Sequence, residues 1–370
     1  MKILFVTDLC PIQENEKGLP LTLLNFILDF KSLGADVTLL RPNIIPNVLI
    51  RKRKILPDGE YLYNGIRIIN KNFLTPFFNE NQFLFLKNLN FDIIVSHMPS
   101  GILAANKISK LLKIPYITSV HSSDIKVLSD IKYLFLKKQM EKAYLEASLV
   151  LPRSLWLKNR IQEIIPKLTI KDTVPSGIDS NIVISQTEID NKVEKFYGNP
   201  YKIFSAGTLI KRKNFEELIK TVAKLDNATL EIGGEGKERK NLERLIKKLN
   251  AQDKIKLLGQ KTQEEIYKSM KNSSVFVLAS KNETFGMVYL EAMSNGCIVL
   301  CPENSGMAGY IKDGFNGFLF QEGSLYDKIK HLKELENAKE IINNACETAK
   351  SMDRLKMAQN YLNLIQNILV

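Results

Sequence analysis

The sequence has no apolar run long enough to cross a lipid bilayer. Charged or polar residues interrupt every hydrophobic stretch well before the roughly 18 residues that a transmembrane helix needs. The first ten residues, MKILFVTDLC, contain neither a basic leader nor a small-residue cleavage site. We therefore expect a cytoplasmic protein that is attached at most peripherally to the inner face of a membrane.

Motifs for metals, redox chemistry and dinucleotides are also missing. The four cysteines show no Cys-x-x-Cys spacing, and two of them lie in GCIVLCP, a pattern typical of a buried strand, which favours reduced core thiols. No Asp-x-Asp occurs, so we expect neither a metal site nor a cofactor. The turn after the first predicted strand, KILFVTD, lacks Gly-x-Gly-x-x-Gly, which argues against an NAD-dependent oxidoreductase.

Positive charge is in excess along the chain. The 52 lysines and arginines outnumber the 40 acids, which gives a formal net charge of +12. Such an excess favours anionic partners, for example nucleotides, phospholipid surfaces or nucleic acid. The basic residues are scattered and no RNP or zinc pattern occurs, so we predict no nucleic-acid partner, with a basic nucleic-acid-binding protein kept as a weak alternative.

Short apolar runs alternate with amphipathic stretches of ten to sixteen residues, the pattern of βα units in a parallel sheet. With 370 residues, the chain suits two domains, and the polar segment 178–200, which ends in Gly-Asn-Pro, predicts the boundary. We expect two Rossmann-like, doubly wound α/β domains at 1–185 and 186–352, and a last helix at 353–370 that crosses back to the first. Ligands of such sheets bind outside the carboxyl ends of the strands, which predicts a site in a cleft between the domains. The strands predicted for the first domain are 2–8, 36–41, 65–70, 92–97, 115–121, 148–152 and 169–175.

Two neighbouring segments break this rhythm. Residues 49–56, LIRKRKIL, are strongly basic, and residues 73–86 carry five phenylalanines. One interpretation is a solvated loop followed by a helix whose aromatic side chains enter the core. The other is a basic and aromatic surface that docks on anionic lipid, because lysine and arginine attract headgroups while phenylalanine enters the interface.

The stretch SKNETFGMVYLEAMSNG, residues 280–296, places two acids eight positions apart. A predicted strand ends near 280 and a helix begins near Phe285 or Gly286, so the unpaired amides and the dipole of the helix N-terminus form a site for a phosphate. Glu283 lies on the loop before these amides, and Glu291 follows on the helix, where a carboxylate can accept hydrogen bonds from a diol. The alternative is that Glu283 caps the helix and Glu291 faces water.

A second loop carries three consecutive basic residues. In AGTLIKRKNFEELI, residues 206–219, a predicted strand ends at Gly207, and Lys211, Arg212 and Lys213 follow before a helix. Three cations at the mouth of a parallel sheet can neutralise a diphosphate leaving group. They can equally be solvated surface side chains. A third loop, GGEGKERKNLERL, is a weaker candidate for phosphate binding, since glycine-rich turns are common.

In combination, these motifs resemble those of one enzyme family. The stretch 280–296 resembles the E-x7-E signature of retaining glycosyltransferases of family 4, which have the GT-B architecture of two Rossmann-like domains facing across a cleft. VPSGID (174–179) resembles the family's Pro-x-Gly-x-Asp turn, AGTLIKRKNFEELI its donor loop, and GFNGFLF (314–320) its Asn-Gly-hydrophobic segment. The first domain would then bind the acceptor and the second the nucleotide-sugar donor.

The resemblance implies roles for the second domain. Glu283 would contact hydroxyls of the transferred sugar, Glu291 the ribose of the nucleotide, and Lys213 the diphosphate, with Glu283 and Lys213 counted as catalytic. Ligand hydroxyls would thereby satisfy the two carboxylates. Backbone amides that would hold phosphate and sugar oxygens are those of Phe285, Gly286 and Met287.

The donor loop departs from the family's pattern at one position. Thr208 stands where an arginine is common, and Lys211 or Arg212 would have to supply that charge. Gly207 and Gly234 complete the predicted donor-binding set.

The resemblance also implies an acceptor side in the first domain. SVHSSD (119–124) is similar to the family's His-x-x-Asp stretch and would put His121 near the reacting sugar as a catalytic residue, with Asp124 beside it. His97 is either an acceptor contact or a packed side chain. The loop at 11–20 usually has two adjacent glycines in the family, whereas this chain has only Gly18.

The function implied is that of a metal-independent, retaining hexosyltransferase of cell-surface polysaccharide synthesis, such as lipopolysaccharide or capsule. Its partners would be a nucleotide-diphosphate sugar and a glycan or lipid-linked saccharide, with an anionic membrane surface as a further partner. Retention would follow from front-face attack, because the sequence offers no well-placed nucleophilic carboxylate. Asp124 is the only nearby candidate for one. A sugar-nucleotide epimerase of the same architecture is the alternative, and incubation with donor alone would distinguish the two.

Overall fold

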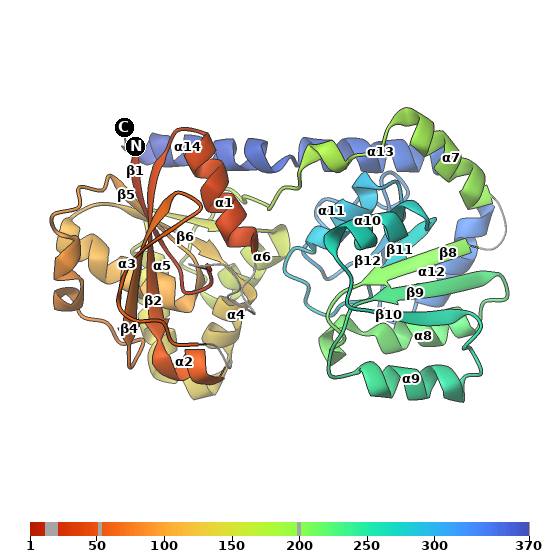
Figure 1. The fold of residues 1–370 in the computed structure, drawn as a ribbon, viewed down its shortest axis with the longest axis horizontal. Coiled ribbons are helices and arrows are strands. Elements are labelled where there is room, and N and C mark those ends of the chain that lie inside the picture. Colours follow the sequence, from red (N-terminus) through yellow and green to blue (C-terminus); the bar gives the residue numbers. More distant parts are fainter. Residues whose placement is uncertain (12–20, 51–53, 198–200, 370) are drawn as a thin grey trace. The chain divides into compact units, whose positions relative to one another are not determined.

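The computed structural model describes residues 1–11, 21–50, 54–197 and 201–369 (Figure 1). By their internal contacts these residues form two compact units, Met1–Pro175 together with Arg354–Val370, and Ser176–Asp353. Composition suggested a boundary at 185, but the segment after Ser176 packs with the second unit: the Ile178 amide donates to the Met352 carbonyl at 3.0 Å, and the Ile184 amide to the Ser294 carbonyl at 2.9 Å.

The first unit contains a seven-stranded sheet of order β3-β4-β2-β1-β5-β6-β7. All neighbouring strands are parallel except β3, which pairs antiparallel with β4. The strands are β1 (Lys2–Val6), β2 (Asp36–Ile44), β3 (Gly59–Tyr63), β4 (Ile66–Phe73), β5 (Ile93–Ser96), β6 (Tyr116–Val120) and β7 (Leu149–Pro152).

Helices cover both faces of this sheet. Alternate residues of β1 enter two separate cores, Ile3 and Phe5 on one face and Leu4 and Val6 on the other, as expected for a parallel sheet buried on both sides. The helices are α1 (Leu21–Ser32), α2 (Ile45–Ile50), η1 (Glu80–Leu86), α3 (Met98–Leu112), α4 (Ser122–Ser129), η2 (Ile131–Tyr133), α5 (Leu134–Leu145), α6 (Leu155–Ile164) and the C-terminal α14 (Arg354–Leu369).

Helix α14 belongs to the first unit through its contacts with α1. The rings of Tyr361 and Phe26 meet edge to face with centroids 5.4 Å apart, and Arg354 forms an ion pair with the buried Asp29 at 3.2 Å. The last helix of the chain therefore closes the core of the first unit.

For this unit one predicted strand was wrong and one strand was missed. Residues 169–175 are irregular, and β3 was not predicted. Strand β3 lies at the sheet edge with both faces largely exposed, so no alternation of apolar and polar residues marks it. Its hairpin turn is the Asn-Gly pair at 64–65, in which both residues have positive φ, a sequence signal that could have located it.

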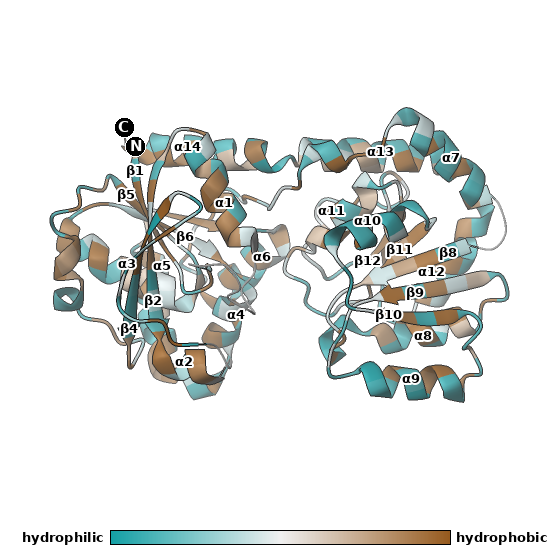
Figure 2. Cartoon of the chain, in the orientation of Figure 1, coloured by the Kyte–Doolittle hydropathy of each residue, from teal (hydrophilic) through white to brown (hydrophobic). Residues whose placement is uncertain are grey.

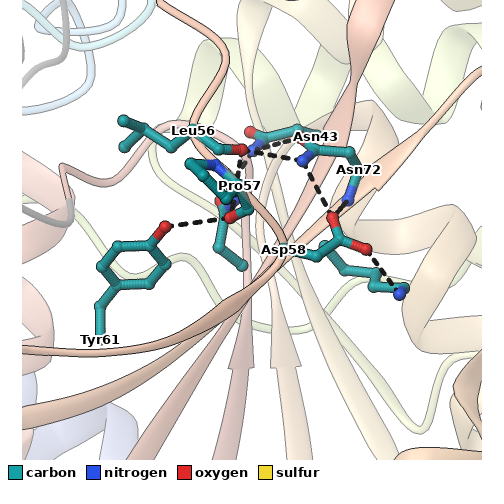
Figure 3. A network of polar contacts seen from close by, with 8 residues as sticks. Asn43, Leu56, Pro57, Asp58, Tyr61 and Asn72 are labelled. Carbon is teal, nitrogen blue, oxygen red and sulfur yellow. Dashed lines mark hydrogen bonds and ion pairs between the residues drawn. The ribbon is translucent and has the colours of Figure 1, made fainter.

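A polar network fixes the segment that precedes β3 (Figure 3). Asn72 donates to the Leu56 carbonyl and to Asp58, at 2.8 and 2.9 Å. The Tyr61 hydroxyl donates to the Pro57 carbonyl at 3.0 Å, and Asn43 extends the network into the sheet through Asn70. These amides satisfy one another and the loop carbonyls, which indicates a structural role.

The aromatic segment 73–86 sends three of its five phenylalanines into the core, while most of its other residues are exposed. Phe73, Phe78 and Phe83 are buried with ring centroids no more than 5.6 Å apart, whereas Phe77 and Phe85 are exposed. Residues 51–53 of the basic stretch lie outside the described residues. No helix in the described ranges has the length and apolar character needed to cross a membrane.

The second unit contains a six-stranded, all-parallel sheet of order β10-β9-β8-β11-β12-β13. Apolar residues run along β8 and β9, while α9 carries a mixed surface (Figure 2). The strands are β8 (Tyr201–Ala206), β9 (Ala228–Gly233), β10 (Ile255–Gly259), β11 (Val275–Val277), β12 (Ile298–Pro302) and β13 (Phe318–Phe320). The helices are η3 (Ser180–Ile182), α7 (Gln186–Tyr197), η4 (Lys211–Lys213), α8 (Phe215–Ala223), α9 (Arg239–Lys248), α10 (Gln263–Lys271), α11 (Met287–Ser294), α12 (Leu325–His331), η5 (Leu332–Glu334) and α13 (Ala338–Ser351).

Candidate functional site

The order of strands in the second unit creates a switch point between β8 and β11. From β8 the chain proceeds to β9 and β10 on one side, and then returns to β11 on the other side. Ligands of doubly wound sheets bind at such a point, outside the carboxyl ends of the strands. The loops after the two strands are joined there, because the Lys281 amide donates to the Arg212 carbonyl at 2.8 Å.

Two cations and one carboxylate meet on these loops. Lys213 Nζ lies 2.5 Å from Glu283 Oε2, and Arg212 Nη1 lies 3.5 Å from the same oxygen. The Ser280 hydroxyl also donates to it, at 3.0 Å. Glu283 is only 7% exposed. The protein itself therefore compensates this buried charge, in a cluster with a net charge of +1.

The cations decide the ionisation of Glu283. Burial raises the pKa of its carboxyl, but the nearby Lys213 ammonium, with Arg212 and the Ser280 hydroxyl, more than offsets this, so the pKa of Glu283 is lowered. The carboxylate is charged at neutral pH and can accept hydrogen bonds. Sequence reasoning missed Ser280, although it lies only three residues before Glu283.

The turn after Glu283 leads into helix α11 through Gly286. This glycine has φ of +88°, and a Cβ there would lie 2.6 Å from the Tyr289 ring. Among the described residues no side chain caps the helix, so its first amides have no side-chain partner at this turn. The side chain of Phe285 is buried against Tyr310, with ring centroids 5.6 Å apart, so a ligand at this turn would have to contact Phe285 through its backbone.

Glu291 lies on the same helix in a different environment. It is partly buried, and its Oε1 accepts a hydrogen bond from Gln263 Nε2 of helix α10 at 2.9 Å. Burial raises the pKa of the Glu291 carboxyl, and the hydrogen bond from Gln263 lowers it by less. Sequence reasoning missed Gln263, because no motif marks it and 28 residues separate it from Glu291.

The two predicted donor-site glycines touch each other. A Cβ on Gly234 would lie 2.0 Å from the Gly207 carbonyl oxygen, and the Gly207 amide donates to the Gly233 carbonyl at 3.0 Å. Close approach of the loops after β8 and β9 therefore requires glycine at 234. Thr208, next in the chain, is exposed.

In the first unit, the carboxyl ends of β5 and β6 bring two histidines together. His97 Nδ1 lies 2.9 Å from His121 Nε2, and the His97 ring stacks on Phe5 with centroids 4.8 Å apart. Burial lowers the pKa of His121 to about 3, and it lowers the pKa of His97 well below its usual value. The charge of the nearby Arg153 adds to both shifts. Both rings are therefore neutral at pH 7, and Arg153, at the end of β7, is a group that sequence reasoning missed.

Asp124 lies in the first turn of α4, which His121 begins. Its Oδ2 accepts a hydrogen bond from the His121 amide at 2.7 Å, an arrangement typical of a helix cap. Burial is the main cause that raises the pKa of the Asp124 carboxyl, to about 8. The remaining predicted acceptor-side residue, Gly18, lies outside the described residues.

Comparison with known proteins agrees with this fold. Residues 186–352 match the family model described as Glycosyl transferases group 1. The chain is 27% identical to an uncharacterized glycosyltransferase of Methanocaldococcus jannaschii, over 71% of this chain and 70% of that protein. It is also 27% identical to a Campylobacter jejuni N-acetylgalactosamine-N,N'-diacetylbacillosaminyl-diphospho-undecaprenol 4-alpha-N-acetylgalactosaminyltransferase, over 70% of this chain and 82% of that one.

Solved structures match over nearly the full length. Anabaena HepE in complex with UDP and glucose superposes with a TM-score of 0.70 at 19% identity, covering 99% of this chain and 100% of that one. The lipopolysaccharide outer core galactosyltransferase WaaB superposes with a TM-score of 0.71 at 17% identity, covering 99% of each chain. Residues 186–352 thus match the Glycosyl transferases group 1 model, the chain has the two-domain GT-B fold, and the named relatives support an enzyme of the glycosyltransferase class.

Proposed function

We propose that this glycosyltransferase is a retaining enzyme of family 4 that moves a hexose or related sugar from a nucleotide diphosphate to a glycan or lipid-linked acceptor. The observation that carries the proposal is the convergence of Lys213 and Arg212 on Glu283, at the switch point of the sheet and beside the uncapped start of α11. The cluster has the charge that a sugar diphosphate needs: cations for the phosphates and a carboxylate for sugar hydroxyls.

In this proposal the donor loop supports the leaving group. Lys213 and Arg212 hold the diphosphate as negative charge develops on it, and the first amides of α11 bind phosphate or sugar oxygens. Arg212 takes the place of the arginine that the family commonly has at the position of Thr208. Its guanidinium already lies within 3.5 Å of the Glu283 carboxylate. These fixed cations support a reaction that needs no divalent metal.

Glu283 and Glu291 have separate roles. Glu283 accepts hydrogen bonds from hydroxyls of the transferred sugar, and Glu291 from the ribose diol. Gln263, which donates to one oxygen of Glu291, holds that carboxylate in place. Neighbouring structures bound to UDP, UDP-glucose, or UDP and glucose support a uridine donor as the first candidate.

The chemical step is a front-face displacement. The acceptor hydroxyl oxygen bonds to the anomeric carbon as the bond from that carbon to the phosphate oxygen breaks. The departing phosphate takes the acceptor's proton, so no carboxylate nucleophile is required. Asp124, which caps α4, is therefore assigned a structural role, and His121 and His97 contribute neutral ring nitrogens on the acceptor side.

A donor panel tests the proposal. The melting temperature of the chain is measured with UDP-, GDP-, ADP- and dTDP-sugars in the presence of EDTA, because a ligand at 100 times its Kd stabilises the fold by about 2.7 kcal/mol. One donor class is expected to stabilise the wild type and to lose most of that effect with Lys213→Ala. NMR of the product formed with a lipid-linked acceptor should show the anomeric configuration of the donor. Dependence on added Mg²⁺, or an inverted product, would reject the respective part of the proposal.

The acceptor class and the cellular role rest on relatives. The similar Campylobacter enzyme is named for a diphospho-undecaprenol acceptor, and a Rhizobium meliloti relative for lipopolysaccharide core biosynthesis. These names support a saccharide on a polyprenyl diphosphate as the first acceptor to assay, in synthesis of a cell-surface polysaccharide.

A further inference from the structure

A short stretch at the end of α4 exposes large apolar side chains. Ile131 is 87% exposed and Phe135 78%, and Leu134 between them is also exposed. The helices η2 and α5 follow each other without a gap, so these three residues lie within little more than one turn. The Asp130 carboxylate accepts a hydrogen bond from the Lys132 amide at 3.2 Å, which orders the start of this turn.

Lysines surround these apolar side chains. Between residues 126 and 138 the chain carries Lys126, Lys132, Lys137 and Lys138 but only one acid, Asp130, a net charge of +3. Lys126, Lys132 and Lys138 are exposed, and Lys137 is partly exposed. Apolar anchors ringed by lysines are the chemistry that binds an anionic membrane interface.

We propose that Ile131, Leu134 and Phe135 insert into the interface of an anionic lipid bilayer, while the lysines around them bind its headgroups. This surface is distinct in the chain from the segments 49–56 and 73–86, and Ile131 and Phe135 are more exposed than any phenylalanine of 73–86. Charge favours a bilayer over a protein partner, because lysine is depleted at protein–protein interfaces. Three side chains also cover far less than the roughly 1,200 Å² that a stable protein interface buries.

Along the chain, only the helix α4 separates this surface from His121, on the proposed acceptor side of the first unit. This helix begins after His121 and has eight residues, so its length is about 12 Å. A bilayer held at Ile131 would therefore bring a lipid-linked saccharide within reach of the histidine pair. This last step rests on the proposed function, whereas the membrane contact itself does not.

Co-sedimentation of the full chain with vesicles tests the contact. We expect binding to vesicles of phosphatidylglycerol and phosphatidylethanolamine, little binding to phosphatidylcholine, and weaker binding at high salt, which screens the lysines. The variant Ile131→Asn/Phe135→Asn should bind roughly tenfold more weakly. The matched control is Leu62→Asn/Leu369→Asn, which replaces two side chains of the same unit that are 77% and 40% exposed and lie outside both segments, and it should bind like wild type.

A fluorescence measurement locates the insertion. A Phe135→Trp variant in a Trp156→Phe background should be quenched by brominated lipids. Absence of quenching, equal binding of Ile131→Asn/Phe135→Asn and wild type, or equal loss in the control variant would each overturn the proposal. So would a dimer in vesicle-free light scattering that the same double substitution dissociates, because a second copy would then cover the surface. Donor-induced stabilisation of Ile131→Asn/Phe135→Asn reports on the proposed function separately.

Discussion

Replacement of Lys213 by alanine should affect both stability and transfer, because it removes the nearest partner of a buried carboxylate. Glu283 would keep Arg212 at 3.5 Å and the Ser280 hydroxyl at 3.0 Å, but it would lose the ammonium at 2.5 Å. Removal of one partner from a buried ion pair costs about 3 to 5 kcal/mol. Since Arg212 and Ser280 remain, we expect Lys213→Ala to lower the free energy of unfolding by about 2 kcal/mol.

A double-mutant cycle isolates the pair. Urea unfolding of wild type, Lys213→Ala, Glu283→Gln and the double variant is followed by circular dichroism without donor. The double variant should be more stable than the sum of the single effects predicts, with a coupling of about 1 to 3 kcal/mol. Lys213→Arg is the matched control, because it keeps the charge and should retain most of the stability.

The dependence on pH has a defined sign. The pKa of Glu283 is lowered in the folded chain, so its contribution to stability is complete above the unfolded value of 4.5 and is lost as the pH falls through the folded value. The stability difference between wild type and Glu283→Gln should therefore shrink in acid. In Lys213→Ala the same pKa should rise, because the ammonium no longer offsets burial.

We expect Lys213→Ala to have a larger effect on the rate of transfer than on stability. Loss of a cation that stabilises the departing diphosphate should lower kcat by about 10²- to 10³-fold, as does removal of one preorganised donor in other enzymes. Initial rates of sugar transfer measure this, with folding checked by the unfolding curves. The proposed role of this ion pair would be refuted by two results together: effects of Lys213→Ala and Glu283→Gln on the free energy of unfolding that add within about 0.5 kcal/mol, and sugar transfer by Lys213→Ala at the wild-type rate.

Three further predictions address neighbouring groups. Glu291→Gln should raise KM for the donor about tenfold and leave kcat nearly unchanged, because the ribose contact is made equally in ground and transition states; initial rates at varied donor test this. Gly286→Ala should destabilise the chain by about 1 to 3 kcal/mol, measured by urea unfolding, because φ is +88° and a Cβ would lie 2.6 Å from the Tyr289 ring. His121 has a folded pKa of about 3 against 6.5 unfolded, so the unfolded state binds its proton first and stability falls by about 2 kcal/mol between pH 8 and pH 5. That fraction of the acid loss should be absent in His121→Asn, and an unchanged pH profile of unfolding would contradict the assignment.

Local sequence signals were sufficient for the α/β class and for the loops that carry the candidate site. The start of the helix at Gly286 followed from the strand–glycine–helix pattern, since φ of +88° strongly favours glycine. Strand β3 escaped prediction because an edge strand exposed on both faces has no apolar periodicity. Residues 169–175 misled in the opposite way. Their apolar residues Ile170 and Val174 are buried on irregular backbone, and the Val174 amide donates to the Pro152 carbonyl of β7 without forming a strand.

Contacts between distant residues could not be predicted in the same way. The two cationic partners of Glu283 come from the loop after β8, about 70 residues earlier, and they meet it because the strand order places β8 beside β11. We expected ligand hydroxyls to satisfy this carboxylate, whereas the chain supplies two cations of its own. Gln263 reaches Glu291 from another helix in the same manner.

The two glutamates of one motif therefore differ in a way that their spacing does not reveal. Cations hold the pKa of Glu283 below its usual value. Burial raises the pKa of Glu291, and the hydrogen bond from the uncharged Gln263 amide offsets only part of that rise. A carboxylate paired with lysine and arginine must share those cations with any diphosphate that binds, so the diphosphate enters by replacing part of an existing network. Within the part of the chain that the structure describes, Glu291 has no cationic partner, and a ribose diol would add hydrogen bonds to its charged form. Donor binding should accordingly favour ionisation of Glu291, and mild acid should weaken affinity through this residue before it affects Glu283.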